Sequence, residues 1–236
     1  MTRTFYWCAA MLLLAAQAGG LATAGTFKTI TIDDLYADWA GVPILDSDGG
    51  DNFGGPDIGD TQIANDNQYL YIRNTFANNL ALGTFITIDV DENPATGFDI
   101  FSLGLVGTEA GWQNDFGFTQ ATGSFNDGVG LTGEFFGGGH ANMAPFADVG
   151  SRELAISLSN MRNGGGATFP DNTIRLLVWV DKGTGADGLP AGFPGDDGRN
   201  YDVSAVINYT LAVPEASSFA LATIAGGSLL IRRRWK

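Results

Sequence analysis

The segment Gln68-Tyr69-Leu70-Tyr71-Ile72-Arg73-Asn74-Thr75-Phe76 is rich in aromatic and β-branched side chains and contains neither Gly nor Pro. This composition over such a length is typical of a β-strand. The turn-forming residues Asn65-Asp66-Asn67 precede it, and the short segment Thr61-Gln62-Ile63-Ala64 comes before them. The stretch therefore predicts a β-hairpin whose turn lies at residues 65–68.

Similar short segments occur along most of the chain and are separated by stretches rich in Gly, Asp and Asn. No window of 12 residues before the C-terminal tail has the apolar spacing of a helix. Seven or more short strands with Gly-rich connections indicate an all-β fold, an antiparallel two-sheet sandwich of the jelly-roll or immunoglobulin-like kind. The other predicted strands are 27–32, 85–90, 101–106, 153–158, 174–180 and 201–211.

The composition and the net charge exclude some classes of function. The chain has 236 residues, of which 44% are hydrophobic and 16% charged, so it can build a core. Its 26 acidic residues against 12 Lys and Arg give a net charge of −14. Such a charge repels phosphate backbones and anionic lipid surfaces, and we expect no nucleic-acid partner.

The N-terminus has the three parts of a secretory signal peptide. Arg3 is followed by an apolar run from Phe5 to Ala16 and by the small-residue pattern Ala22-Thr23-Ala24. We expect cleavage after Ala24, and the alternative is an uncleaved N-terminal anchor. Cys8, the only cysteine, would be removed with the signal, so the exported chain would form no disulfide.

The C-terminus carries a second membrane signal. Residues 216–231 are apolar and uncharged, and Arg232, Arg233 and Arg234 follow directly. The basic residues favour a cytoplasmic C-terminus, which places the acidic domain at residues 25–212 outside the cell. That domain has 25 acidic and 7 basic residues, a net charge of −18.

The same tail, residues 213–236, resembles a PEP-CTERM sorting signal. The match comprises the motif Val213-Pro214-Glu215-Ala216, the apolar helix predicted at 216–231 and the basic end at 232–236. The resemblance implies sorting by an exosortase and delivery to the cell envelope, the cell surface or an extracellular matrix. Ala216 stands where the family's second proline is usual, which puts cleavage of the tail in doubt. A plain membrane-anchoring segment would give the same topology.

The start of the domain resembles family 9 carbohydrate-binding modules and their DOMON-like relatives. The residues that carry this resemblance are Ile30-Thr31-Ile32-Asp33 and Asp38-Trp39, with later matching segments at 64–72, 85–91 and 153–158. The resemblance implies a β-sandwich that, in some members, binds sugars or haem. Haem ligation is disfavoured because His140 is the only histidine and methionines are few.

One acidic segment is a candidate calcium loop. Asp89, Asp91, Asn93 and Asp99 follow a predicted strand and offer carboxylate and amide oxygens, the ligands that Ca²⁺ takes. The segments 46–51 and 57–60 form a second oxygen-rich region. The alternative is that these residues only form turns.

Aromatic residues are the candidate sugar contacts. Trp112 lies in a polar segment beside Gln113 and Asn114, where an exposed ring would have hydrogen-bonding neighbours. Trp179 lies in an apolar strand, and we expect it in the core. Trp39 lies near the start of the domain, and we expect it to be buried at one end of the sandwich.

No catalytic residue is predicted. A Ser-His-Asp hydrolase would depend on His140, and the chain has no Gly-x-Ser-x-Gly motif. The sequence therefore predicts an exported, non-enzymatic module that binds polysaccharide, with calcium as a candidate ion. The alternatives are a structural matrix or envelope component with calcium-stabilised loops and no glycan recognition, and a glycoside-active enzyme.

Overall fold

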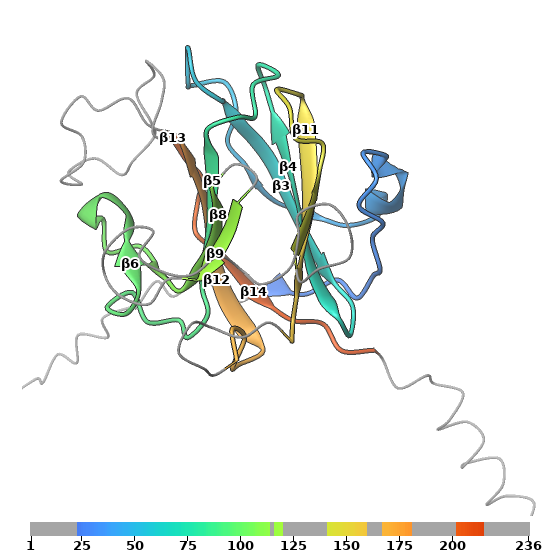
Figure 1. The fold of residues 1–236 in the computed structure, drawn as a ribbon, viewed down its shortest axis with the longest axis vertical. Coiled ribbons are helices and arrows are strands. Elements are labelled where there is room, and N and C mark those ends of the chain that lie inside the picture. The colour runs from blue at the N-terminus through green and yellow to red at the C-terminus, as the bar shows by residue number, and fades with distance from the viewer. Residues whose placement is uncertain (1–22, 114–115, 120–140, 160–166, 181–201, 215–236) are drawn as a thin grey trace, which may run out of the picture.

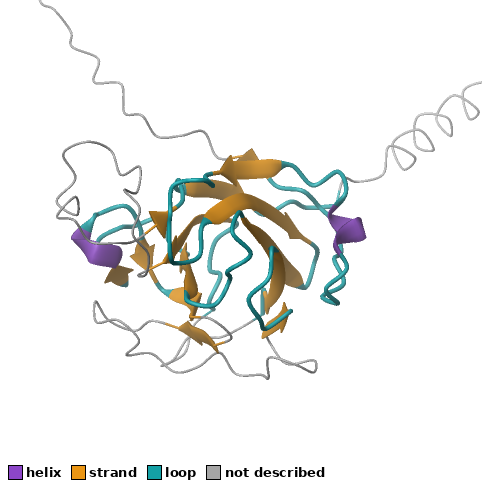
Figure 2. Ribbon diagram, turned by 90° about the horizontal axis from the view of Figure 1, so that it is seen from above, coloured by secondary structure: helices purple, strands orange, loops and turns teal. Residues whose placement is uncertain are grey.

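A computed structural model describes residues 23–113, 116–119, 141–159, 167–180 and 202–214 of the chain. In this part the chain forms strands connected by loops, with two short 3₁₀ turns, η1 (Tyr36–Trp39) and η2 (Ile100–Ser102), and no α-helix. Figure 2 shows these two turns at the flanks of the strand layers. The predicted all-β class is confirmed for the described residues.

The strands form two main sheets that pack face to face (Figure 1). The first has the order β1-β14-β12-β5-β8-β9 with β13 beside β12, and the second the order β10-β11-β4-β3-β2. All pairs within these sheets are antiparallel except β1 with β14. The first sheet contains β1 (Thr23–Ala24), β5 (Thr84–Asp89), β8 (Ala110–Gln113), β9 (Phe116–Thr119), β12 (Thr173–Val180), β13 (Asp202–Val203) and β14 (Ile207–Thr210). The second contains β2 (Ile44–Ser47), β3 (Ile58–Asn65), β4 (Tyr69–Phe76), β10 (Ala141–Ala144) and β11 (Ser151–Ser157).

Strand β12 shows how the core forms. Ile174, Leu176 and Val178 point inward and pack against the second sheet, whereas Leu177 and Trp179 belong to a separate cluster on the outer face. A small ribbon, β6 (Phe98–Asp99) with β7 (Gly107–Thr108), and η2 contribute residues to that outer cluster. Because apolar clusters lie on both of its faces, the second part of β12, residues 176–180, is continuously apolar, without alternation.

The segment predicted as a strand at 27–32 is not one, because only a single parallel bridge joins Phe27 to Asn65. The chain crosses the outer face of the second sheet and inserts Ile30 and Trp39 into a cluster with Tyr71. The side chain of Glu153 anchors this segment by accepting hydrogen bonds from Asp33 N and Asp34 N. Alternating apolar residues here reflect packing on a sheet face.

Two other strand predictions are wrong in part. Segment 101–106 contains the end of η2 and a turn, with positive φ at Ser102 and Gly104. Segment 201–211 divides into β13 and β14 because Ser204 interrupts it, its N–H donating to Val178 O and its Oγ accepting from Val178 N. The strands predicted at 68–76, 85–90, 153–158 and 174–180 and the hairpin at 65–68 are confirmed.

The register defines two ends of the sandwich. Thr173 of β12 lies opposite Thr210, and Val180 at its other end lies opposite Asp202. One end, which we call the exit end, contains the hairpin 65–69 and the segment 209–214, the last described segment of the chain. The loop end contains loops 48–57, 77–83 and 145–150. Figure 1 shows β13 near the top and the red end of the chain leaving from the bottom.

Candidate functional site

Three carboxylates in or next to strands β5 and β8 of the first sheet meet near the exit end. Asp89 ends β5, Asp91 lies in the loop after it, and Glu109 lies between β7 and β8. One oxygen of each can be chosen so that all three lie within 4.8 Å of one another. Asp89 and Glu109 are buried and Asp91 is exposed, so the cluster opens to solvent on one side. Three hard oxygen donors so arranged suit Ca²⁺ chemically.

Strand pairing and short hydrogen bonds position these groups. Glu109 N donates to Ile88 O (3.1 Å), and Glu109 Oε2 accepts from Val90 N (3.0 Å). Thr96 Oγ1 donates to Glu109 Oε1 at 2.8 Å and lies 3.1 Å from Asp91 Oδ1. Arg175 Nη1 lies 3.6 Å from Asp89 Oδ2 and offsets part of the negative charge.

Burial raises the pKa of Glu109 to about 7, and repulsion by Asp91 and Asp89 adds to this effect, although two hydrogen bonds oppose it. Burial likewise raises the pKa of Asp89, against the attraction of Arg175. Negative charge is therefore unfavourable at this cluster without a further cation.

The cluster contains two of the four residues predicted as calcium ligands. The side chain of Asn93 accepts a hydrogen bond from Ala95 N (3.1 Å). The backbone N–H of Asn93 donates to the side chains of Asp89 and Asp91. Asp99 accepts from Gly104 N (2.8 Å) and is not part of the carboxylate group. Sequence reasoning missed Glu109 because the β7–β8 connection, not sequence proximity, brings it to Asp89. The one sequence feature that could have indicated Glu109 is a single acidic residue between two short buried strands.

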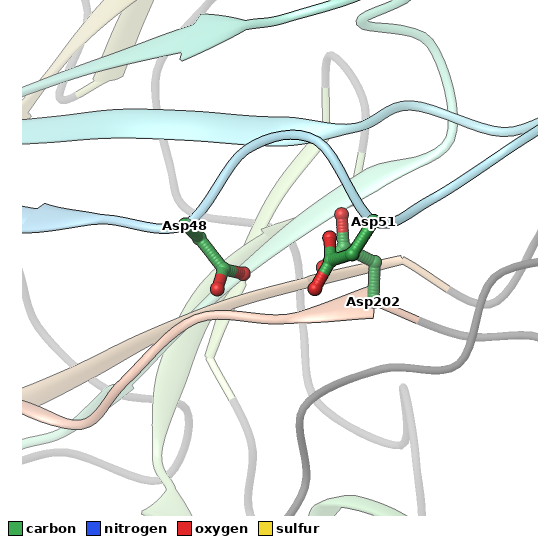
Figure 3. A group of neighbouring side chains, drawn as sticks. All are labelled: Asp48, Asp51 and Asp202. Carbon is green, nitrogen blue, oxygen red and sulfur yellow. The ribbon is translucent and has the colours of Figure 1, made fainter.

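A second carboxylate group lies at the loop end and joins the two sheets. Asp48 and Asp51 come from the β2–β3 loop of one sheet and Asp202 from β13 of the other, as Figure 3 shows. Asp202 Oδ2 also accepts a hydrogen bond from Ile58 N at 2.8 Å. Sequence reasoning identified the loop but missed Asp202, because more than 140 residues separate it from Ile58.

The acids of this region differ in their roles. Burial, followed by repulsion from Asp51, raises the pKa of Asp48 to about 6. Asp57 instead accepts from Gly50 N (2.9 Å), and Asp46 accepts from Ala205 N (3.1 Å). Asp57 therefore stabilises the loop, as expected of a turn-forming residue, and Asp46 in β2 contacts the other sheet.

The prediction that Trp112 presents an exposed ring is wrong. Trp112 is 0% exposed and packs in the main core between the sheets. The polar neighbours in its sequence had suggested a surface position, but β8 pairs with β5 and directs the indole inward. Trp179 is buried, as predicted, and stacks on Phe85 with ring centroids 4.0 Å apart. Trp39 is also buried, but it packs with Ile30 and Tyr71 on the outer face of the second sheet and not at an end of the sandwich.

The loop end carries exposed apolar side chains that sequence reasoning did not select. Phe53 is 64% exposed, and Leu82 and Phe146 on the two neighbouring loops are also exposed. Hydrogen bonds connect the three loops: Asn78 Nδ2 donates to Gly55 O (2.6 Å), and Leu82 N donates to Asp148 Oδ1 (2.9 Å). The loop end therefore offers exposed apolar groups among carboxylates and amides.

Several predicted residues lie outside the described part of the chain: Ala22, Asn114, His140, Glu215, Ala216 and Arg232–Arg234. Ala24 pairs with Thr210 in β1, and Val213 and Pro214 follow the last strand. Gln113 ends β8 opposite Phe85. The described residues include no helix long and apolar enough to cross a membrane.

Comparisons with known proteins give only distant similarity. No family model matches the sequence, and no curated protein matches it. Among solved structures, a family 9 carbohydrate-binding module from Caldicellulosiruptor kristjanssonii in complex with glucose aligns over 83% of this chain and 98% of its own, with 9% identity and a TM-score of 0.45. A structure of such a module from the same organism with cellotriose aligns over 82% and 94%, with 10% identity and a TM-score of 0.40.

Proposed function

We propose that this protein is an exported, non-enzymatic β-sandwich module that binds polysaccharide through its loop end and holds calcium at the Asp89-Asp91-Glu109 cluster. The sequence resemblance to family 9 carbohydrate-binding modules supports the ligand class. The predicted signal peptide and sorting tail support export, anchoring through the apolar segment 216–231, sorting by an exosortase, and a location in the envelope or matrix.

The exposure of Phe53 carries the assignment of the binding surface. An aromatic ring that is 64% exposed beside Asp51 and Asn52 combines an apolar platform with oxygen groups. Sugars present the complementary surface, because apolar C–H groups stack on rings while hydroxyls form hydrogen bonds. The loop is braced from within, since Asn52 Nδ2 donates to Pro56 O (2.7 Å) and Asp57 binds Gly50. A braced loop loses little conformational entropy on binding.

The calcium proposal rests on the Asp89-Asp91-Glu109 cluster near the exit end. Asp89, Asp91 and Glu109 would supply carboxylate oxygens, and a bound cation would offset the burial and repulsion that raise the pKa values of Asp89 and Glu109. Calcium here would stabilise the fold near the exit end, at a distance from the proposed glycan surface.

A glycan array with residues 25–212, in calcium and in chelator, tests the function. We expect binding to at least one glycan, and Phe53→Ala should abolish it. The matched control is Phe27→Ala, which removes an exposed ring at the exit end and should leave binding intact. Equal loss in both variants would contradict the assignment of the loop end.

The alternative function is a structural matrix or envelope component with calcium-stabilised loops. The large net charge of −18 in the domain favours an ion-stabilised protein in either case. Failure of the folded domain to bind any glycan, together with a calcium-dependent melting temperature, would support this alternative.

A further inference from the structure

Asn65 connects the first and last described segments of the domain. Its side chain is buried and forms a two-way pair with Ala212: Ala212 N donates to Oδ1 at 2.7 Å, and Nδ2 donates to Ala212 O at 2.9 Å. The hydroxyl of Tyr209 donates to the same Oδ1 at 3.0 Å. The Asn65 backbone also pairs with the N-terminal segment, through Thr26 O (3.0 Å) and Lys28 N (2.8 Å).

This arrangement fixes the point at which the C-terminal tail leaves the body. Ala212 is held on both its N–H and its C=O, whereas Val213 is 72% exposed. Only residues 213–215 separate Ala212 from the apolar segment that begins at Ala216. Even fully extended, the chain from Ala212 to Ala216 reaches only about 14 Å. A long flexible linker is therefore missing between the body and the apolar segment.

The strand register places the proposed glycan surface at the opposite end. Thr173 of β12 lies opposite Thr210, close to the exit, and Val180 lies opposite Asp202 of the loop-end carboxylate group. These two positions are about 23 Å apart along an extended strand. Figure 1 shows β13 near the top of the sandwich and the chain after β14 leaving from the bottom.

We propose that Asn65 is a positioning residue that docks the tail, so that the exit end faces the membrane surface and the loop end faces away from it. The inference rests on the proposed function, which makes the tail a membrane anchor and the loop end a glycan surface. The partner of the exit end is a lipid surface that the short connection brings close to the 65–69 hairpin. The loop end is thereby presented to polymer outside the cell.

Lipid-borne quenching of single-cysteine labels tests the orientation. The processed chain, residues 25–236, which lacks the predicted signal peptide and its Cys8, is reconstituted in phosphatidylcholine vesicles that contain a headgroup quencher. A fluorophore is attached at Asn67→Cys, exposed in the hairpin, or at Ala77→Cys, exposed at the loop end. We expect strong quenching at position 67 and none at position 77.

Two further variants test the role of the dock. Asn65→Ala removes both side-chain bonds to Ala212, and we expect the contrast between positions 67 and 77 to be lost. The matched control Asn74→Ala removes another buried asparagine, which binds Thr61 and does not contact the tail, and should keep the contrast. Inserting about ten Gly and Ser residues after Ala212 leaves Asn65 unchanged and lengthens the connection. This insertion should also abolish the contrast, even if Asn65→Ala fails to fold.

The outcomes separate this inference from the proposed function. If the parent chain floats with the vesicles but is quenched equally at positions 67 and 77, the proposed orientation is wrong and the proposed anchor still holds. Persistent contrast in folded Asn65→Ala would overturn the role of Asn65. A chain that does not float with vesicles would overturn the proposed anchor, and the orientation with it.

Discussion

Glu153 is a buried carboxylate that attaches the N-terminal segment to the second sheet. Its Oε1 accepts hydrogen bonds from Asp33 N and Asp34 N (both 2.9 Å), and its Oε2 accepts from Trp39 Nε1 (2.7 Å). Burial raises the pKa of Glu153, while these three hydrogen bonds oppose the rise. Each bond to a charged acceptor contributes on the order of 1.5–3 kcal/mol.

The first prediction concerns Glu153→Gln. The amide group would place N–H donors against one set of existing donors, so we expect a loss of roughly 2–3 kcal/mol in the free energy of unfolding. Urea denaturation measures it. Glu92→Gln, the same change at an exposed site, should alter stability by less than about 0.5 kcal/mol. Equal effects at both sites would show that Glu153 does not anchor the segment.

The second prediction concerns pH and metal at Glu109. Because its pKa is about 7 in the folded protein and near 4.5 when unfolded, the folded state binds more protons between these values. Stability in chelator should therefore fall as pH rises from about 4.5 to about 7, by up to roughly 3 kcal/mol. Free calcium at 100 times its Kd should restore about 2.7 kcal/mol at pH 7.

Thermal melts of the parent chain and of Glu109→Gln, in chelator and in calcium, measure both effects. The Gln variant should lose the pH-dependent fall and the gain from calcium, while Glu92→Gln should keep both. A melting temperature that calcium leaves unchanged in the parent chain would count against the metal cluster.

At the residue scale, the sequence indicated which loops are acidic but not which acidic side chains meet in each cluster. Asp89 and Asp91 could be selected because they lie together after an apolar run. Glu109 and Asp202 could not, since only strand pairing and sheet packing bring them to their clusters. The local hydrogen bonds of Asn93 and Asp99 are likewise turn geometry, which residue type alone does not distinguish from ligation.

At the element scale, strand β8 turns a polar-looking segment into core. Trp112 packs among residues of both sheets, and its Nε1 has no hydrogen-bond partner among the described residues. Removing the ring should therefore destabilise the protein through a cavity, whereas removing the N–H removes no hydrogen bond.

The third prediction follows from that position. Trp112→Ala should cost about 3–5 kcal/mol, and Trp112→Phe distinctly less. Urea denaturation followed by near-ultraviolet circular dichroism measures the change, and glycan binding should be retained by the Phe variant. If Trp112→Ala kept the native stability and lost glycan binding, Trp112 would be a binding residue and not a core residue.

Elements buried on one or both faces could be predicted from pattern. The apolar run of β12 and the aromatic segment of β4 both predicted strands, and the structure confirms them. The segment 27–32 did not, because covering a sheet face selects the same alternation as pairing within a sheet. The break at Ser204 depends on tertiary hydrogen bonds to Val178 and has no local signal.

At the scale of the whole molecule, the two ends of the sandwich have different tasks in this account. The exit end ties the first and last described segments together through Asn65, and the loop end exposes Phe53 among acids and amides. The acidic charge of the domain disfavours anionic partners, so we expect the preferred polysaccharide to be neutral or cationic.

Hydrogen exchange of the domain, with and without a polysaccharide ligand found on the glycan array, shows which end of the sandwich binds the glycan. We expect new protection in residues 48–57, 77–83 and 145–150, and unchanged exchange in the hairpin 65–69 and the segment 209–212. Protection confined to the exit end, or to the outer face of either sheet, would contradict this expectation.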